Sequence, residues 1–260
     1  FFTTQLGGDK VDVTNITPSG AEPHDFEPTT QDIAKIEGGN LLILNGSVEA
    51  WGQKVTDLLK GSTVQVVTAG QGLLTRSLTE NGETMSDPHV WLDPVLAKQE
   101  AHAIEQGLAA ADPANADYYA QNERILDQKL DKIDADYQAG LKTCVRKNII
   151  TSHAAFAYLA ERYGLNQVAI DGLSPDAEPS AKQLADVATF AKSHGVTYIF
   201  FESLVSPKLS QTIATEVGAK TLVLDPLEGI SDADQAAGKN FLTVMEDNLK
   251  NLQTALQCTT

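Results

Sequence analysis

Three of the five histidines in this 260-residue chain stand in short polar segments that lie far apart in the sequence. They are His24 in PSGAEPHDFEPT, His89 in MSDPHVWLDP and His153 in IITSHAAFAYL. A neutral imidazole nitrogen is a good ligand for a borderline-soft divalent cation, and three imidazoles leave one position for a carboxylate or water. The residue types therefore indicate a metal site whose ligands the fold must bring together.

Carboxylates at the ends of predicted strands are the candidates for the remaining position. Asp225 ends the segment KTLVLD, and Glu202 ends the segment IFFE in the same way. Either could also be a helix cap or a surface carboxylate. Asp93, in WLDP, is expected to orient His89 from behind, as carboxylates often do for metal-bound imidazoles, and Glu202 is the second candidate for such a supporting role.

The two other histidines have ordinary structural explanations. His102 lies on the face of a predicted helix in KQEAHAIEQ. His194 ends a predicted helix in AKSHG, where an imidazole interacts favourably with the helix dipole. We therefore expect neither of them to be a metal ligand.

Short apolar runs alternate with amphipathic segments along the whole chain. This alternation predicts an α/β fold built from parallel βαβ units, with the polar stretch 70–89 as a loop. The predicted strands are 11–16, 40–46, 62–69, 147–152, 167–172, 196–203 and 220–225. The predicted helices are 29–38, 50–61, 94–113, 112–141, 153–164, 180–195, 207–218 and 236–256.

One helical pattern is much longer than a small lobe requires. Apolar residues recur at helical spacing through 112–141, and the first glycine in this segment is Gly140. The order of predicted strands and helices before this segment resembles the order after it. We therefore predict an N-terminal α/β lobe over 1–111, a linking helix over 112–141 and a C-terminal α/β lobe over 142–260.

Composition narrows the class of protein. The formal net charge is −16, which argues against binding nucleic acid or an anionic membrane face and favours the attraction of cations, although acidity also serves solubility. No apolar run is long enough to span a bilayer, and no signal peptide stands at Phe1, so we expect a mature exported protein or a trimmed chain. Cys144 and Cys258 could form a disulfide in an oxidising compartment, or could be two free thiols.

Several signatures of enzymes are absent from the sequence. It contains no HExxH, GxSxG, P-loop or GxGxxG motif. Ser152 is adjacent to His153, but residues adjacent in a chain do not form a nucleophile–base pair. We therefore predict that the protein is not an enzyme.

Four segments together resemble a known family. They are GGDKVDVTNITPSGAEPHDFEPT, DPHVWLDP, TSHAAFAYLAERYGL and FFESLVSPKLSQTIATEVGAKTLVLDPL, and they occur in the family's order across the chain. The sequence is similar to the cluster A-I solute-binding proteins of bacterial ABC importers, which bind zinc or manganese. The resemblance implies two α/β lobes joined by one long rigid helix, with the metal in the cleft between the lobes.

The resemblance also implies a ligand set and a metal. Carried onto this chain, the family's ligands fall on His24, His89, His153 and Asp225. Three imidazoles and one carboxylate suit Zn²⁺ in a tetrahedral site, whereas Mn²⁺ prefers more oxygen ligands and a higher coordination number. Many zinc-type members carry a histidine-rich loop before the second ligand, but 70–86 contains no histidine here.

The implied function is the capture of zinc and its delivery to the membrane permease of an ABC importer. The resemblance implies a monomer in a periplasm or outside the cell, either free or held by a lipid anchor. Zinc affinity should fall below about pH 6.5, because imidazole must be deprotonated to bind. The alternatives are a manganese carrier, a surface adhesin lipoprotein that depends on a metal, and a zinc hydrolase with an activated water.

Overall fold

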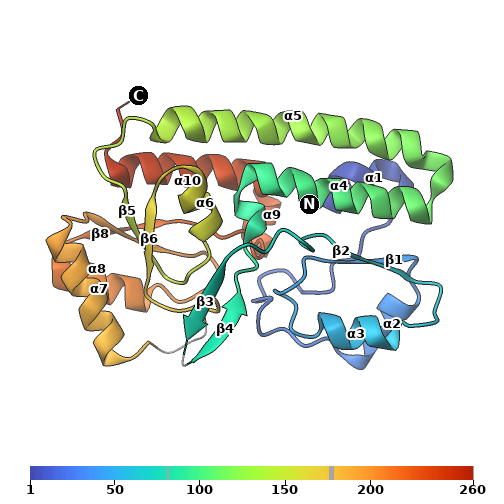
Figure 1. Cartoon of the computed structure of the whole chain (residues 1–260), viewed down its shortest axis with the longest axis horizontal. Coiled ribbons are helices and arrows are strands. Elements are labelled where there is room, and N and C mark those ends of the chain that lie inside the picture. Colours follow the sequence, from blue (N-terminus) through green and yellow to red (C-terminus); the bar gives the residue numbers. More distant parts are fainter. Residues whose placement is uncertain (81, 176–178, 260) are drawn as a thin grey trace.

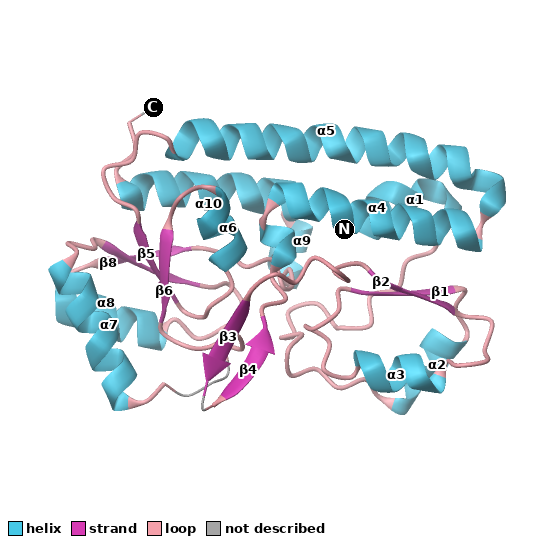
Figure 2. Cartoon of the chain, in the orientation of Figure 1, coloured by secondary structure: helices cyan, strands magenta, loops and turns pink. Residues whose placement is uncertain are grey.

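The computed structural model describes residues 1–80, 82–175 and 179–259 and has the predicted mixed α/β architecture. Figures 1 and 2 show two groups of strands and short helices below a layer of long helices. The helices of the first half are α1 (Phe2–Gly7), η1 (Gly8–Lys10), α2 (Thr30–Glu37), α3 (Gly52–Leu58), η2 (Val90–Leu92), α4 (Pro94–Ala111), η3 (Pro113–Asn115) and α5 (Ala116–Leu141). Those of the second half are α6 (Ala157–Arg162), α7 (Ala181–Ser193), α8 (Lys208–Val217), α9 (Asp232–Ala236) and α10 (Phe241–Leu256).

The strands of the two lobes form separate sheets. In the N-terminal lobe β1 (Leu41–Leu44) pairs in parallel with β2 (Gln65–Thr68). In the C-terminal lobe β6 (Asn166–Ala169), β5 (Asn148–Thr151), β7 (Tyr198–Phe201) and β8 (Lys220–Val223) form a parallel sheet in that order. The predicted parallel βαβ units are therefore confirmed in both lobes.

Two sequence predictions of local structure are wrong. The segment 11–16 is not a strand, although its alternating apolar residues suggested one. Within the predicted loop 70–89, β3 (Ser77–Glu80) and β4 (Glu83–Ser86) form an antiparallel hairpin. Polar residues such as Ser77 and Thr79 concealed it, because an exposed two-stranded ribbon needs no apolar face.

The long helix α5 joins the lobes and buries one face. Its buried residues are Tyr119, Leu126, Leu130, Ile133, Tyr137 and Leu141, which recur at helical spacing. This face packs against α4 and α10, and the Tyr137 hydroxyl donates to Met245 O on α10 at 2.8 Å. Full burial of each leucine or isoleucine contributes about 1.5–3 kcal/mol, so α5 is anchored along its whole length.

A glycine sets the distance between the helical layer and the N-terminal sheet. A Cβ at Gly107 on α4 would lie 2.5 Å from Cγ2 of Val67 on β2. Any larger residue would therefore push α4 away from the sheet. This close approach sets the distance between the C-terminal part of α4 and β2.

The two cysteines form a disulfide. Cys144 follows α5 and Cys258 follows α10, and the bond closes a loop with a sequence separation of 114 residues. Beside it, Arg146 N donates to Leu256 O at 3.0 Å. The disulfide alternative in the sequence is therefore confirmed, and it ties the ends of two long helices together.

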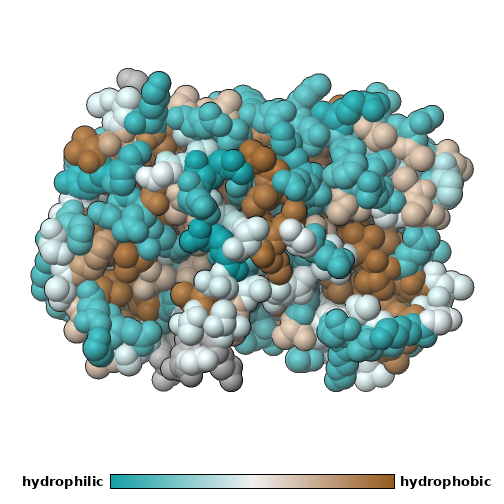
Figure 3. All heavy atoms as spheres, viewed as in Figure 1, coloured by the Kyte–Doolittle hydropathy of each residue, from teal (hydrophilic) through white to brown (hydrophobic). Residues whose placement is uncertain are grey.

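Within the described part of the chain, none of the helices has the length and apolar character needed to cross a membrane. Hydrophilic residues cover most of the upper part of the face shown in Figure 3, where α4 and α5 lie. Brown, hydrophobic patches lie mainly between this layer and the elements below it.

Candidate metal centre

The carboxyl edge of the C-terminal sheet supplies one side of the site. β5, β7 and β8 are parallel neighbours, so their carboxyl ends meet at one edge of the sheet. His153 lies shortly after β5, Glu202 directly after β7, and Glu228 in the loop after β8. This edge is where ligands collect in open α/β sheets.

The other side of the site comes from irregular segments of the first half of the chain. His24 lies in the long connection between η1 and α2. His89 lies between the hairpin strand β4 and α4, at the start of η2. Neither imidazole is carried by a strand or helix, so other contacts must hold both.

Three imidazoles converge on one carboxylate oxygen, that of Glu228. Glu228 Oε1 lies 2.9 Å from Nε2 of His89, 3.1 Å from Nε2 of His153 and 3.3 Å from Nε2 of His24. The donor atoms of all four residues lie within 4.8 Å of one another. Three nitrogens and one anionic oxygen, grouped in this way, can bind a single divalent cation after small side-chain movements.

Two further carboxylates stand behind two of the three imidazoles, one behind each. Asp87 Oδ1 lies 2.8 Å from Nδ1 of His89, and Glu202 Oε1 lies 2.7 Å from Nδ1 of His153. All four of these residues are buried. A carboxylate that accepts from Nδ1 fixes the tautomer in which Nε2 presents its lone pair to a metal.

The same two carboxylates also accept backbone hydrogen bonds from their histidines. His89 N donates to Asp87 Oδ1 at 3.0 Å, and His153 N donates to Glu202 Oε1 at 3.2 Å. Ser152 Oγ is a further donor to Glu202. Ring and backbone are thereby held together, which restricts the rotation of each imidazole.

The charges at this site shift its pKa values in opposite directions. Burial disfavours the imidazolium of His153, but Glu202 and Glu228 outweigh burial and raise its pKa to about 10. Burial likewise opposes a charge on His89, and Asp87 and Glu228 nevertheless raise its pKa. Burial alone would raise the pKa of Glu228, yet hydrogen bonds from the three histidines hold it well below the usual range. A cation can replace the protons in this cluster.

Contacts with the second half of the chain hold the segment 87–93. Trp91 Nε1 donates to Pro226 O at 2.7 Å, in the loop that carries Glu228. From α6, the Tyr158 hydroxyl donates to Asp87 O at 3.1 Å. Arg162 on the same helix pairs with Asp93 at 2.7 Å. His89 is therefore fixed against the C-terminal lobe, although its sequence precedes α5.

His24 is held differently from the other imidazoles. Its backbone N–H donates to Glu22 Oε1 at 3.2 Å, and its Nε2 contacts Glu228, but in the described residues no carboxylate stands behind its Nδ1. Its side chain is 10% exposed, whereas those of His89 and His153 are fully buried. Burial and the charge of Glu228 raise the pKa of Glu22 to about 7.

Asp225, the predicted fourth ligand, does not join this cluster. Its carboxylate accepts from Leu227 N at 2.8 Å and from Ser203 Oγ. The chain then turns at Leu227, which has a φ of 61°, and this turn directs Glu228 toward the imidazoles. Asp225 thus shapes the loop, and Glu228 has the position that the sequence argument gave to Asp225.

Asp93 does not stand behind His89 either. It accepts from Val95 N at 2.9 Å as the cap of α4, and it pairs with Arg162. Asp87, two residues before His89 in DPH, has that position instead. Glu202 does stand behind an imidazole, that of His153. Two carboxylates close to the predicted site residues were not predicted from the sequence. Asp87 lies two residues before His89, and Glu228 lies three residues after Asp225.

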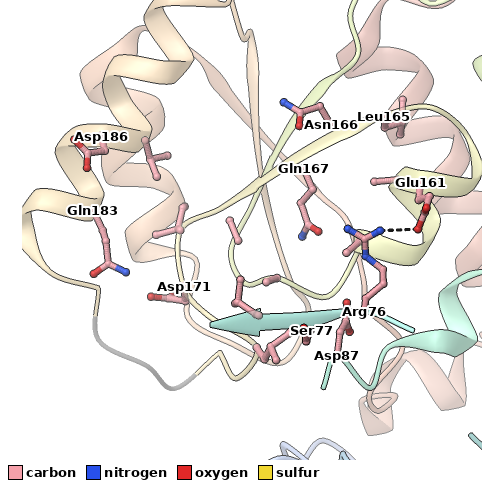
Figure 4. Close-up of a pocket in the computed structure, with 18 residues that line it drawn as sticks. Arg76, Ser77, Asp87, Glu161, Leu165, Asn166, Gln167, Asp171, Gln183 and Asp186 are labelled. Atoms are coloured by element: carbon pink, nitrogen blue, oxygen red, sulfur yellow. Dashed lines mark hydrogen bonds and ion pairs between the residues drawn. The ribbon is translucent and has the colours of Figure 1, made fainter. Parts of the chain in front are cut away.

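A separate cavity of about 550 Å³ lies against β6, the edge strand of the C-terminal sheet. Figure 4 shows Arg76 and Glu161 paired at one end of this cavity, with Gln183 and Asp186 at the other. Asp87 borders it, but none of the three clustered imidazoles lines it. Its side chains do not converge on a common point, so it is not the metal centre.

Similarity to proteins of known sequence covers nearly the whole chain. It is 41% identical to the high-affinity zinc uptake system protein ZnuA of Bacillus subtilis, over 98% of this chain and 84% of that protein. It is 39% identical to the zinc-binding lipoprotein AdcA of Streptococcus pneumoniae, over 97% of this chain. The chain spans 53%, about half, of the length of AdcA.

Solved structures give the same result for the fold. The Zn(II)-bound ZnuA-like domain of Streptococcus pneumoniae AdcA superposes with a TM-score of 0.85 at 40% identity, covering 98% of this chain and 94% of that one. The laminin-binding protein Lmb of Streptococcus agalactiae, described as a bifunctional protein with adhesin and metal transporting activity, gives 0.88 at 36% identity, with coverage of 98% and 94%. The family model for ZnuA, the periplasmic component A of the zinc-uptake complex, matches residues 1–255, and the chain belongs to this family.

Proposed function

We propose that this protein captures Zn²⁺ outside the cytoplasm and delivers it to the permease of an ABC importer. The observation that carries the proposal is the convergence of three imidazole nitrogens and the Glu228 carboxylate on one point between the lobes. The relatives named above are zinc uptake and zinc-binding proteins. They support zinc as the metal and uptake as the function.

The proposed ligands are His24, His89, His153 and Glu228. Three neutral nitrogens and one carboxylate complete a tetrahedral shell for Zn²⁺, and the carboxylate offsets part of the ion's charge. Asp87 and Glu202 accept from the other ring nitrogens and strengthen the two buried imidazoles as ligands. Zinc is the cargo of this site and is released at the permease.

The donor set argues against two of the alternative functions. Manganese prefers more oxygen ligands than one carboxylate supplies. A zinc hydrolase needs an open position for a water and a nearby general base. Glu228 would have to leave the three imidazoles to open that position, which would break the hydrogen bonds that it shares with them. Catalysis is therefore no part of the proposed function.

Adhesion is the remaining alternative. An experiment can distinguish an adhesin with a structural metal from a zinc carrier. An adhesin with a structural metal loses its fold when the metal is removed, whereas a carrier stays folded and rebinds zinc. The large shared core along α4, α5 and α10 does not depend on the four ligands. We therefore expect the metal-free protein to be folded.

The proposal includes an arrangement of parts. The lobes 1–111 and 142–260 act as two platforms, and the helix segment 112–141 keeps them at a fixed distance. Release then requires movement of loops near the ligands rather than a wide hinge. We propose a monomer that works in a periplasm or at the outer face of a membrane, either free or held by a lipid anchor.

Zinc titration of two matched variants tests the site. The full chain, stripped of metal, competes for zinc with a chromogenic chelator, and bound metal is quantified by mass spectrometry. Glu228→Gln is expected to lower zinc affinity at least about 100-fold, because loss of a ligand costs more than loss of a supporting contact. Asp225→Asn is expected to keep an affinity within a few-fold of the wild type.

The opposite ranking of these two variants would show that Asp225 is the ligand. Binding of manganese in preference to zinc would contradict the choice of metal. Growth under zinc limitation tests delivery: cells that lack this protein should be rescued by the wild type and not by Glu228→Gln. Rescue by both variants would contradict a role for this site in uptake.

A further inference from the structure

The packed helices α4 and α5 carry a line of paired charges along their shared groove. Lys98 on α4 pairs with Asp131 on α5, and one turn further along α4 His102 contacts Glu123. Since the residue number rises on one helix as it falls on the other, the helices run antiparallel. Figure 1 shows α4 below and beside the part of α5 that lies over the N-terminal lobe. This groove is separate from the central cluster of imidazoles.

Three side chains in this groove bring metal-ligating atoms together. They are His102 and Glu105 on α4 and Glu123 on α5, and one donor atom from each lies within 4.8 Å of the others. His102 and Glu105 share a helix face because they are three residues apart. His102 Nδ1 already lies 2.6 Å from Glu123 Oε1.

Glu105 differs from the exposed charged residues of this groove, which pair with a neighbour. It is only 8% exposed, and the described residues offer no hydrogen-bond donor or cation to its carboxylate at bonding distance. Burial and the nearby Glu123 raise its pKa. The residue as a whole is largely covered, and a bound cation would give its carboxylate the counter-charge that no hydrogen-bond donor among the described residues supplies.

The other ring nitrogen of His102 faces a side chain that can support ligation. His102 Nε2 lies 2.9 Å from Gln106 Nε2, one turn further along α4. If Nδ1 binds a metal, Nε2 carries the proton, and the Gln106 amide can turn to accept it through its oxygen. A supporting acceptor on the second nitrogen is typical of metal-bound histidines.

We propose that His102, Glu105 and Glu123 form a second binding site for a divalent transition metal. The position of His102 on a helix face suggested a purely structural residue, and the unpartnered Glu105 changes that interpretation. One imidazole and two carboxylates suit Zn²⁺ and its neighbours Cu²⁺ and Ni²⁺, with water completing the shell. Ligand atoms in a tetrahedral zinc site lie about 3.4 Å apart, so the cluster must contract slightly on binding.

The second site differs from the central one in ways that predict weaker binding and faster exchange. The His102 side chain is 56% exposed, and that of Glu123 is 16% exposed. Three protein ligands replace four, and ordering an exposed imidazole costs side-chain entropy. The carboxylate of Asp127, with one buried oxygen that lacks a hydrogen bond, adds negative charge nearby.

Equilibrium dialysis of the full chain against Zn²⁺, with metal analysis of the protein, tests the proposal. The wild type is expected to bind two zinc ions, the second more weakly than the first. His102→Gln and Glu105→Gln are each expected to lower the association constant of the second ion by about tenfold or more. The first ion should bind unchanged in both. His194→Gln, which removes an exposed histidine at the end of α7, is the matched control and should bind two.

A second measurement keeps the test independent of the central site. The variant His24→Ala with His89→Ala should still bind one zinc ion, and NMR should show the metal on Nδ1 of His102. A wild type that saturates at one ion, or a second ion that is insensitive to both His102→Gln and Glu105→Gln, would overturn the proposal. If Glu105→Gln fails to fold, His102→Gln decides the question, because its side chain is largely exposed. Loss of the first ion alone would count against the central site and leave this one intact.

Discussion

The two sides of the central cluster are held in different ways. His153 and Glu228 follow strands of the C-terminal sheet, and His89 is fixed to the same lobe through Trp91 and Tyr158. His24 lies in an irregular connection, and its Nδ1 has no carboxylate behind it among the described residues. Three of the proposed ligands therefore form a preorganised half-site, and His24 completes it from a less constrained segment. The difference predicts which residues matter for stability and which mainly for affinity.

The largest contrast is expected between His153→Ala and His24→Ala. Both should reduce zinc affinity by more than about 100-fold, because each removes a proposed ligand. In metal-free protein His153→Ala should also lower the free energy of unfolding by about 3–5 kcal/mol, because it leaves buried carboxylates without their counter-charge. His24→Ala should cost less than about 1 kcal/mol. Urea unfolding in the presence of a chelator measures both, and equal losses would contradict the half-site.

The disulfide provides the next test, because it closes the lobe that carries the preorganised half. Its loop has a sequence separation of 114 residues, so Cys144→Ser with Cys258→Ser should lower the free energy of unfolding by about 2–4 kcal/mol. Zinc affinity of the folded variant should stay close to that of the wild type, since the bond lies beyond the ends of α5 and α10. A large loss of affinity at temperatures where the variant is folded would show that the half-site depends on this bond.

Glu202 and Asp93 form a matched pair for the role of supporting carboxylates. Glu202→Gln should lower zinc affinity by about 10–100-fold, because the carboxylate no longer accepts from His153 Nδ1. Asp93→Asn should change affinity by less than about threefold, since Asp93 caps α4 and pairs with Arg162. Calorimetric titration with zinc gives both values. A larger loss of zinc affinity in Asp93→Asn than in Glu202→Gln would mean that the position of segment 87–93 controls zinc binding more than the contact between Glu202 and His153 does.

Glu100 gives an effect that depends on pH, and it contrasts with Glu228. Burial and the charge of Glu49 raise the pKa of Glu100 to about 8, whereas imidazoles lower that of Glu228. Because the folded pKa of Glu100 exceeds the unfolded value, its contribution is complete below about pH 4.5 and is lost as pH rises to about 8. Glu100→Gln should flatten the pH dependence of stability in this window by up to about 1.4 kcal/mol per pH unit.

Urea unfolding at several pH values measures this slope. Glu161→Gln, an exposed carboxylate paired with Arg76, is the control and should leave the slope unchanged. A slope that is identical in wild type and Glu100→Gln would mean that Glu100 is charged throughout this range. The N-terminal lobe would then tolerate a buried carboxylate without an imidazole partner.

The sequence predicted the parts of this protein that depend on repeating patterns. The buried face of α5 follows helical spacing, and the parallel strands follow short apolar runs. Position at a strand end correctly indicated the edge of the sheet where the candidate site lies. Side-chain direction beyond a strand depends on the turn that follows, and no pattern in the sequence specifies it. Asp225 and Glu228 are separated by one such turn, as their different contacts show.

The loop after β8 has a consequence for the way this site can change over evolution. Leu227 adopts a φ of 61° directly before Glu228, whose carboxylate faces the imidazoles. A single inserted or deleted residue between Asp225 and Glu228 would swing the carboxylate away without disturbing the sheet. Ligand chemistry here is therefore encoded partly by segment length. Aligned relatives should be compared by loop length as well as by residue identity.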